Sequence, residues 1–307
     1  MTKVLVATEK PFAAIAVKGI QKIVEDAGFE FALFEKYTEK SDLAKAVVDA
    51  DALIVRSDII DRGIIEAAGK LKIVVRAGAG YDNLDLKAAS EKKIVAMNTP
   101  GQNANAVAEL VMGMMIYHAR GCFSGKSGTE LLGKSIGLHA YGNVAKRVAA
   151  IARGFGMKVY AFDPFVRAEE MEKEGVIPVQ KMEDLYKNCQ YISLHMPANE
   201  KTRGLINYEL LSLMPEGATL VNTARKEVID EASLMKIFLE RKDFKYLSDI
   251  TPDCAADIAS QHEGRYYFTP KKMGAQTAEA NINAGLAAAN QIVRFFKTGD
   301  TTFQVNK

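Results

Sequence analysis

Residues 135–149 read Ser-Ile-Gly-Leu-His-Ala-Tyr-Gly-Asn-Val-Ala-Lys-Arg-Val-Ala, and the fold prediction starts from them. The apolar beginning closes a predicted strand, and the Ala-rich end opens a predicted helix. Ala140, Gly142 and Ala145 occupy the three small-residue positions of the G-x-G-x-x-G/A pattern. Only the middle glycine is intact, so we expect alanine at the first position to strain or reshape the tight turn.

Strands and helices alternate on both sides of this turn. Short β-branched runs such as 3–7 and 52–55 alternate with helical segments through the first hundred residues, and a second series runs over 135–249. This alternation predicts an α/β fold of two doubly wound parallel sheets, one flavodoxin-like and one of the Rossmann type.

Two helical stretches suggest how the domains are connected. Residues 103–120 are apolar almost all round, as in a helix buried between domains or subunits, and they make a homodimer a reasonable expectation. An Ala- and Asn-rich stretch at 275–297 is expected to return to the first domain. We therefore predict a substrate-binding domain from 1–100 plus 280–307 and a cofactor-binding domain from 101–279.

Composition narrows the class of protein. The chain has 307 residues, of which 48% are hydrophobic and 25% charged, with a net charge of +2. This balance disfavours a nucleic-acid or membrane surface, and no apolar stretch resembles a signal peptide or approaches the ~20 residues of a membrane span. Cys122, Cys189 and Cys254 are odd in number and widely spaced. We expect a reduced, cytoplasmic protein with a small-molecule partner and no metal site.

The turn at 140–145 predicts a dinucleotide site. Its glycine allows a pyrophosphate to approach the backbone, and the helix N-terminus supplies free N–H groups. Asp163 ends the next predicted strand about 20 residues on, where a carboxylate accepts the ribose hydroxyls and repels a 2′-phosphate. The pattern therefore favours NAD over NADP. The alternative is an ordinary strand–turn–helix with an incidental glycine and a strand-end aspartate.

Further stretches carry a family resemblance in matching order and spacing. They are residues 75–85 with 98–109, residues 193–207, residues 221–231, and the closing 269–277. Together with the turn, they make nearly the whole chain resemble the D-2-hydroxyacid dehydrogenase family.

The resemblance implies a set of cofactor contacts. His195, in a Leu-His-x-Pro motif, is implied to line the cofactor groove and not to transfer protons, whereas His118, His139 and His262 have no motif around them. The implied cofactor residues are Ala140, Tyr141, Gly142, Asn143, Val144, Asp163, His195, Met196, Pro197, Thr202, Thr223, Ala224 and Asp249.

The resemblance also implies how a substrate carboxylate is held. The turn 78–80 offers backbone N–H groups to an anion, although it also suits a plain glycine turn. Arg225 is implied to grip the carboxylate and the 2-oxo oxygen together, a task that suits a planar, two-pronged donor. Lys226 stands where the family usually has glycine, so the local turn is expected to differ.

The proton-transfer site departs from the family pattern. Relatives pair a histidine with a glutamate, and neither is present here. Counting back from the Gly274-x-x-Thr277 anchor places Lys272 in the histidine position, while counting forward from Thr-Pro places Lys271 there. We favour Lys272 as the group that exchanges a proton with the 2-oxo oxygen. The alternative is an inactive enzyme.

Two strand ends suggest the substrate. Arg56-Ser57 and Arg76 end neighbouring predicted strands, where parallel sheets bind ligands. In phosphoglycerate dehydrogenases such residues hold a phosphate, which implies oxidation of D-3-phosphoglycerate to 3-phosphohydroxypyruvate, the entry to serine biosynthesis. The alternative without a ligand is that Arg56 and Arg76 form salt bridges at the ends of their strands. The implied substrate-binding residues are Arg56, Ser57, Arg76, Ala79, Gly80 and Asn103.

Other functions remain open from the sequence. A glyoxylate or hydroxypyruvate reductase, or a D-lactate dehydrogenase, shares everything except the need for Arg56. A nucleotide-sensing protein like the family's corepressors is the alternative of another class, because the His–Glu pair is missing. The chain ends at Lys307, so the C-terminal regulatory domains of some relatives, and inhibition by serine through them, are not expected.

Overall fold

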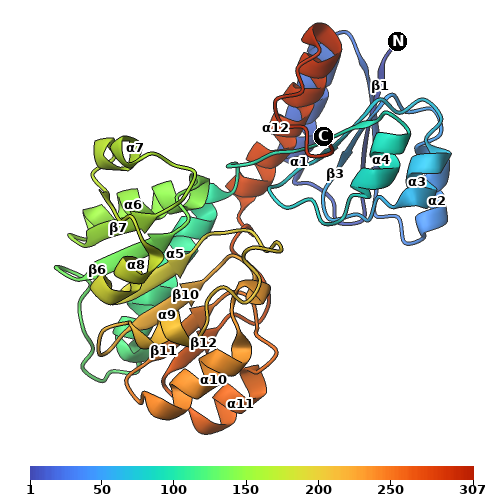
Figure 1. The fold of residues 1–307 in the computed structure, drawn as a ribbon. Coiled ribbons are helices and arrows are strands. Elements are labelled where there is room, and N and C mark those ends of the chain that lie inside the picture. Colours follow the sequence, from blue (N-terminus) through green and yellow to red (C-terminus); the bar gives the residue numbers. More distant parts are fainter. The chain divides into compact units, whose positions relative to one another are not determined.

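The computed structural model describes residues 1–307 as two compact units. The first consists of Met1–Asn103 and Ala275–Lys307, and the second of Ala104–Gly274 (Figure 1). Each is built on a parallel sheet with helices interleaved along the chain. The predicted fold class of two doubly wound parallel sheets is therefore confirmed. The unit borders lie at 103/104 and 274/275, compared with 100/101 and 279/280 in the sequence-based prediction.

The first unit has a five-stranded sheet in the order β2-β1-β3-β4-β5. Its strands are β1 (Lys3–Thr8), β2 (Glu30–Glu35), β3 (Ala52–Val55), β4 (Ile73–Arg76) and β5 (Val95–Asn98). Its helices are α1 (Ala14–Asp26), α2 (Lys40–Ala46), α3 (Arg62–Ala67), α4 (Leu86–Glu91) and α12 (Ala278–Thr298).

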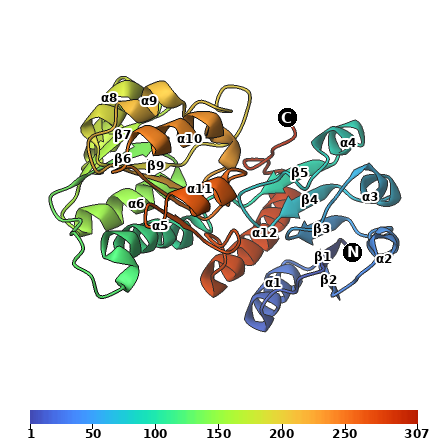
Figure 2. The same cartoon turned by 90° about the horizontal axis from the view of Figure 1, so that it is seen from below.

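Helices cover both faces of this sheet. α1 and α12 lie side by side on one face and share a core with it, while α2, α3 and α4 pack on the other (Figure 2). Polar side chains start several of these helices: Asp61, Asp85 and Thr277 each accept a backbone N–H of the first turn. α12 ends at Gly299, whose φ of 71° suits a residue without a Cβ.

The second unit has a seven-stranded sheet in the order β12-β11-β10-β9-β6-β7-β8. Its strands are β6 (Ser135–His139), β7 (Lys158–Phe162), β8 (Ile177–Pro178), β9 (Tyr191–Leu194), β10 (Thr219–Asn222), β11 (Lys245–Ser248) and β12 (Tyr266–Phe268). Its α-helices are α5 (Ala104–Ala119), α6 (Asn143–Gly154), α7 (Ala168–Lys173), α8 (Met182–Asn188), α9 (Tyr208–Ser212), α10 (Glu231–Glu240) and α11 (Ala255–Gln261). Two 3-10 turns are η1 (Gly121–Phe123) and η2 (Lys226–Val228).

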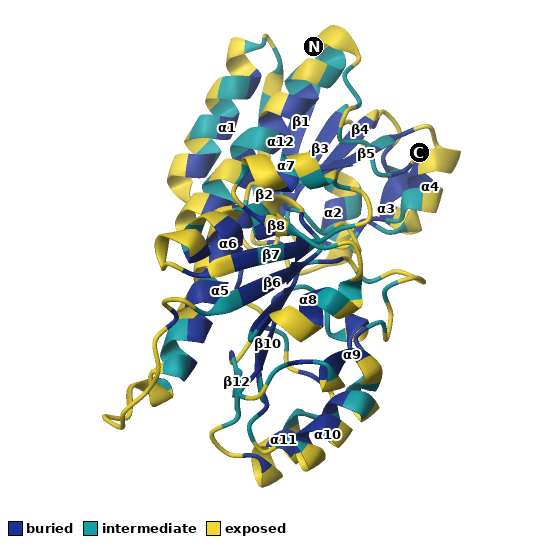
Figure 3. Ribbon diagram, turned by 60° about the vertical axis from the view of Figure 1, so that its left-hand side comes forward, coloured by how far each residue is buried: buried dark blue, intermediate teal, exposed yellow.

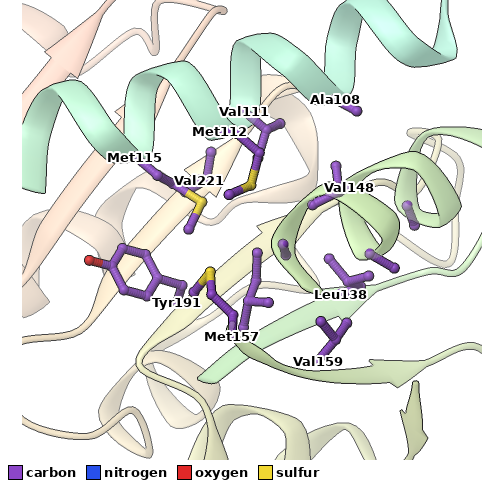
Figure 4. Packing of buried hydrophobic residues seen from close by; sticks show 14 of the residues in the cluster. Ala108, Val111, Met112, Met115, Leu138, Val148, Met157, Val159, Tyr191 and Val221 are labelled. Atoms are coloured by element: carbon purple, nitrogen blue, oxygen red, sulfur yellow. The ribbon is translucent and has the colours of Figure 1, made fainter. Parts of the chain in front are cut away.

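The central strands of the second unit are buried on both faces, as parallel strands between helix layers must be (Figure 3). α5 and α6 cover one face, where Met112 and Met115 pack near Met157 and Tyr191 (Figure 4). α8, α9, α10 and α11 contribute to the core on the other face. The helices therefore hold the loops at the carboxyl ends of the strands in fixed positions. No helix has both the length and the apolarity to cross a bilayer.

Candidate active site

Of the two outcomes expected for alanine at the first position, a strained or a reshaped turn, the structure shows the strained one. Ala140 follows β6 with φ at 71°, in the left-handed region that glycine adopts without cost. Its N–H donates to the Phe162 carbonyl at 2.9 Å, so the turn is tied to the end of β7. The alanine is therefore held in the shape expected of the first glycine of the pattern, and the chain carries the strain.

The N-terminus of α6 is open to an anion. Gly142 is its N-cap, and no side chain accepts a hydrogen bond from the first turn. A Cβ built on Gly142 would meet nothing within 4 Å. The unbonded N–H groups of the first turn and the positive end of the helix dipole therefore face space in which a phosphate fits.

Asp163 is fixed beside this turn. Its two oxygens accept the backbone N–H of Tyr141 at 2.7 Å and that of Phe165 at 2.8 Å. Each oxygen keeps further lone pairs for ligand hydroxyl groups. The carboxylate is thus oriented by the backbone before any ligand arrives.

A partly buried side-chain network supports the same turn, and the sequence offered no sign of it. The Tyr141 hydroxyl donates to Glu174 at 2.7 Å, and Lys146 of α6 donates to the other Glu174 oxygen at 2.8 Å. Lys146, followed by Tyr141, holds the pKa of Glu174 below its usual range. Because Glu174 lies at the end of α7, 33 residues from Tyr141, no local pattern could have revealed the contact.

Neutral histidines lie beneath the cofactor edge. His139 is buried and its Nδ1 lies 3.0 Å from the Tyr186 hydroxyl. Burial lowers the pKa of His139 to about 4 and the pKa of His195 to about 3. Both rings are therefore neutral near pH 7 and have no imidazolium proton to donate. The remaining histidines, His118 and His262, are buried away from this edge.

The loops after β9 and β10 place the other implied cofactor residues. The Thr202 hydroxyl donates to the Pro197 carbonyl at 2.6 Å and closes the loop that contains Met196. After β10, the Thr223 hydroxyl is buried with no hydrogen-bond partner, and the Ala224 N–H donates to Asn222 at 2.9 Å.

Arg225 and Lys226 stand on a braced loop. The Asn222 side chain donates to the Arg225 carbonyl at 2.9 Å, which fixes the backbone where the guanidinium starts. Lys226 forms an ion pair with Asp253, and Glu231 accepts the Asp253 N–H at 2.9 Å. Lys226, which stands where glycine was expected, thus connects the loop after β10 to the loop after β11.

Asp249 connects this loop to the lysine pair. It is 1% exposed, accepts the Gly274 N–H at 2.8 Å through one oxygen, and has no partner for the other. Burial raises the pKa of Asp249, while the positive charges of Lys272 and Arg225 oppose that rise. Lys272 and Arg225 are therefore near enough to the same buried carboxylate to act on it electrostatically.

The two lysines differ in their surroundings. The carbonyl of Lys271 accepts the Thr269 hydroxyl at 2.8 Å, which folds that residue's backbone into the turn before Lys272. Only Lys272 is among the charges that act on Asp249. Lys272 and Arg225 thus both act on Asp249.

The first unit gathers its guanidinium groups at the carboxyl edge of its own sheet. Arg56 donates to the carbonyls of Lys10 and Pro11 at 2.9 Å each and to Asn281 at 2.6 Å. It forms no salt bridge, so its partners are neutral acceptors and not the carboxylate of a strand-end ion pair. Two of its five N–H groups are left for a ligand. Ser57, the next residue, is exposed.

Arg76 lies directly over the glycine turn. Its Nε donates to the Arg56 carbonyl at 3.0 Å. A Cβ on Gly78 would approach the Arg76 Nη1 to 1.6 Å, so only glycine permits this position. The Asn98 amide donates to the Ala79 carbonyl at 2.6 Å and turns the 78–80 backbone. The two guanidinium groups and the turn therefore lie together, while Asn103 lies at the border of the unit.

Comparison with known proteins supplies the family. The model of the "D-isomer specific 2-hydroxyacid dehydrogenase, NAD binding domain" matches residues 105–261. The chain belongs to this family. A hydroxypyruvate reductase of Thermotoga maritima is 36% identical over 285 residues, which are 86% of this chain and 91% of that protein.

Phosphoglycerate dehydrogenases are among the similar proteins. That of Methanocaldococcus jannaschii is 35% identical over 291 residues, which are 90% of this chain but 55% of its own length. The chain therefore spans about half of this longer relative. A crystal structure of NAD+-bound 3-phosphoglycerate dehydrogenase from Entamoeba histolytica is 50% identical, with a TM-score of 0.88, and covers 100% of this chain and 99% of its own.

This 2-hydroxyacid dehydrogenase uses NAD. The second unit fits that cofactor on three counts: the open turn at Gly142, the uncapped start of α6 and the oriented carboxylate of Asp163. The chain is an oxidoreductase of this family, as are the relatives named above. No group of side chains in the structure is arranged to hold a metal ion.

Proposed function

We propose that this dehydrogenase oxidises D-3-phosphoglycerate to 3-phosphohydroxypyruvate, as the first step of serine biosynthesis. The observation that carries the proposal is the pair of guanidinium groups at one sheet edge, with Arg76 seated on Gly78 and Arg56 held by carbonyls. Two fixed cations beside the exposed Ser57 suit a phosphate monoester. Similarity to enzymes named D-3-phosphoglycerate dehydrogenase supports it.

The catalytic roles follow from the charges around Asp249. NAD, when bound, would be held at the turn after β6 and by Asp163, and it would supply the acceptor for the hydride that leaves C2 of the substrate. Arg225 holds the substrate carboxylate and polarises the oxygen at C2. Lys272 takes the hydroxyl proton during oxidation and returns it during reduction. Because Lys272 must be a neutral amine to accept that proton, oxidation should accelerate as the pH rises.

In the same proposal, the cofactor contacts are those implied by the sequence, with two refinements. Asp163 binds the ribose hydroxyls through lone pairs left free by its backbone partners. Asp249 accepts a ligand N–H through the oxygen that has no partner in the protein. A buried acceptor of this kind is costly unless a ligand satisfies it.

The test compares phosphorylated and unphosphorylated substrates in one enzyme preparation. NADH oxidation is measured with 3-phosphohydroxypyruvate and with hydroxypyruvate, in the unchanged enzyme and in Arg76→Met. We expect Arg76→Met to lower the ratio of the two kcat/KM values about 10- to 100-fold, the value of a charged hydrogen bond. The ratio is insensitive to partial unfolding, because both substrates report on the same folded molecules.

Arg62→Met is the matched control, since Arg62 is an exposed arginine of the same unit that pairs with Glu91. It should leave the ratio unchanged. A ratio near one in the unchanged enzyme would reject the phosphorylated substrate.

A second candidate is reduction of hydroxypyruvate. Arg56 uses three of its five N–H groups on the fold, and the Thermotoga maritima relative is named a hydroxypyruvate reductase. The same assay distinguishes the two candidates.

We also propose that the enzyme is a cytoplasmic homodimer. All three cysteines are free, which suits a reducing compartment. Light scattering coupled to gel filtration measures the mass directly, and a monomer at micromolar concentration would reject the dimer.

A further inference from the structure

A cavity lies at the amino ends of the strands in the second unit. It has a volume of about 470 Å³. The last turns of α5, the segment 127–129 and the residues that begin β9, β10 and β11 line it. The fingerprint turn follows the carboxyl end of β6, so this cavity is at the opposite edge of the sheet from the NAD site.

Three basic side chains line the cavity and no acidic one does. They are His118, Lys134 and Lys245. The Lys245 ammonium donates only to the Asp243 carbonyl, at 3.3 Å, and neither lysine forms an ion pair. The carboxylate of Asp243 is instead occupied by Arg241 and by the Gly217 N–H.

The two lysines act on each other. Burial lowers the pKa of Lys245, Asp243 opposes this change, and the charge of Lys134 lowers the pKa further. Half-buried charges are normally paired, because an unpaired charge loses hydration without compensation. The end of α5 contributes only about half a negative charge, which is less than the two ammonium groups supply. The cavity is therefore positive, and no carboxylate of this chain lines it.

The remaining lining suits a phosphate group. Ser127, Thr129 and Thr219 offer hydroxyl groups, and Gln190 offers an amide. Gly128 holds its segment against α5, since a Cβ there would come within 2.4 Å of the Ala119 carbonyl. Lysines bind phosphate as point charges while neutral donors complete the shell. The volume exceeds that of a free ion and is in the range of small-ligand sites.

We propose that this cavity is a second ligand site, which binds a phosphate monoester of a small polar molecule. The site is independent of the proposed substrate. It uses no residue of the cofactor edge or of the arginine edge in the first unit.

Nuclear magnetic resonance of the histidine rings tests the proposal. The chain has only four histidines, so their ring signals are resolvable. His118 lines the cavity, and His139 at the far end of β6 is the internal control. The NAD-saturated enzyme is titrated with glycerol phosphate, inorganic phosphate or sodium chloride at matched ionic strength. We expect a saturable shift of His118 with glycerol phosphate, a weaker response to phosphate, and no shift of His139.

Variants assign the shift to the cavity. Lys245→Met and Lys134→Met should each weaken the affinity at least about tenfold, the loss of one charged contact. Lys245→Arg keeps the charge and should restore most of the affinity. Lys236→Met, which removes an exposed lysine of α10, should change nothing.

Several results would overturn the proposal. One is a linear response that sodium chloride reproduces, which would mean ionic screening only. Another is equal weakening by Lys236→Met. A third is a change of molecular mass in Lys245→Met, which would show that the lysines face a second copy of the chain. Because glycerol phosphate is not the proposed substrate, failure here leaves the dehydrogenase proposal standing.

Discussion

At the carboxyl edges of the two sheets, the backbone fixes ionised side chains of opposite charge. In the first unit, backbone carbonyls and an amide hold the guanidinium group of Arg56. In the second, backbone N–H groups hold the carboxylates of Asp163 and Asp249. Acceptors fix a cation and leave its remaining N–H groups for an anion. Donors fix a carboxylate and leave its lone pairs for hydroxyl or amide groups.

The difference shows that the fold determines at which edge of the sheet a ligand binds. The local backbone, through the side chain that it holds there, determines which kind of ligand binds. Both edges lie where parallel sheets place binding sites. A phosphate suits the first and a ribose the second. The amino edge of the second sheet is a third case, in which Lys134 and Lys245 form no ion pair.

The largest effect is expected at Lys272, the proposed proton donor. It distinguishes the carboxyl edge of the second sheet from a surface that only binds the cofactor. Lys272→Met should lower kcat by about 10²- to 10⁴-fold, because general acid–base catalysis contributes that much. Lys271→Met is the neighbouring control and should be nearly silent. Equal turnover of Lys272→Met and the unchanged enzyme in stopped-flow and steady-state assays would remove Lys272 from the mechanism.

The second largest effect is expected at Arg225, whose guanidinium group lies near the carboxylate of Asp249. Arg225→Lys keeps the charge but loses two-pronged binding, and kcat/KM should fall about 10²- to 10³-fold, as for loss of a donor to the reacting oxygen. Lys226→Met disturbs only the loop brace to Asp253 and should cost far less. Steady-state kinetics measure both variants. Equal losses of kcat/KM in Arg225→Lys and Lys226→Met would contradict this account.

Acid should destabilise the second unit selectively, because all four histidines lie in it. Burial lowers the pKa of His139 to about 4 in the folded state, against about 6.5 for an unfolded chain. The unfolded state therefore binds more protons in this window. Stability is full above pH 6.5 and declines as the pH falls towards 4, by on the order of 3 kcal/mol for this group.

Hydrogen exchange of backbone amides, measured at pH 7 and pH 5, resolves the two units. Protection should fall in the strands around β6 more than in the first unit. Equal loss in both units would mean that carboxylates, and not His139, govern the acid response.

A smaller effect is expected at the network beneath the fingerprint turn. Tyr141→Phe removes the hydrogen bond to Glu174 and should raise the KM for NAD about tenfold with kcat little changed. Tyr208→Phe is a matched control, since its hydroxyl makes the same 2.7 Å bond to Glu240 at the surface. Fluorescence titration measures the affinity of both variants for NADH. Equal affinities would argue against a positioning role for Tyr141.

The smallest effect tests backbone strain in the two units. Ala140→Gly relieves a left-handed alanine, and Lys93→Gly relieves a left-handed lysine with φ at 57° in the first unit. Each should stabilise the chain by up to about 1 kcal/mol in urea unfolding. Only Ala140→Gly should change the affinity for NAD. Destabilisation by Ala140→Gly would show that the turn depends on the alanine methyl group.

Local sequence determined the fold and the NAD turn. Strand and helix periods are short-range, and the spacing of Ala140, Gly142 and Asp163 is set by one strand–turn–helix unit and the strand after it. The sequence left open whether alanine at position 140 strains or reshapes the turn, and the structure shows the strained, left-handed backbone. The family followed from motifs that lie in the same order along the chain.

Tertiary structure decided which partners those residues have. Only packing brings Glu174 to Tyr141, Asn281 to Arg56, and Asp253 to Lys226. Only the sheet order gathers Lys134 and Lys245 around one cavity, although 111 residues separate them in the chain. These residues are far apart in the sequence, and no periodic pattern or motif relates their positions. Their electrostatic interactions can therefore be worked out only once the fold is known.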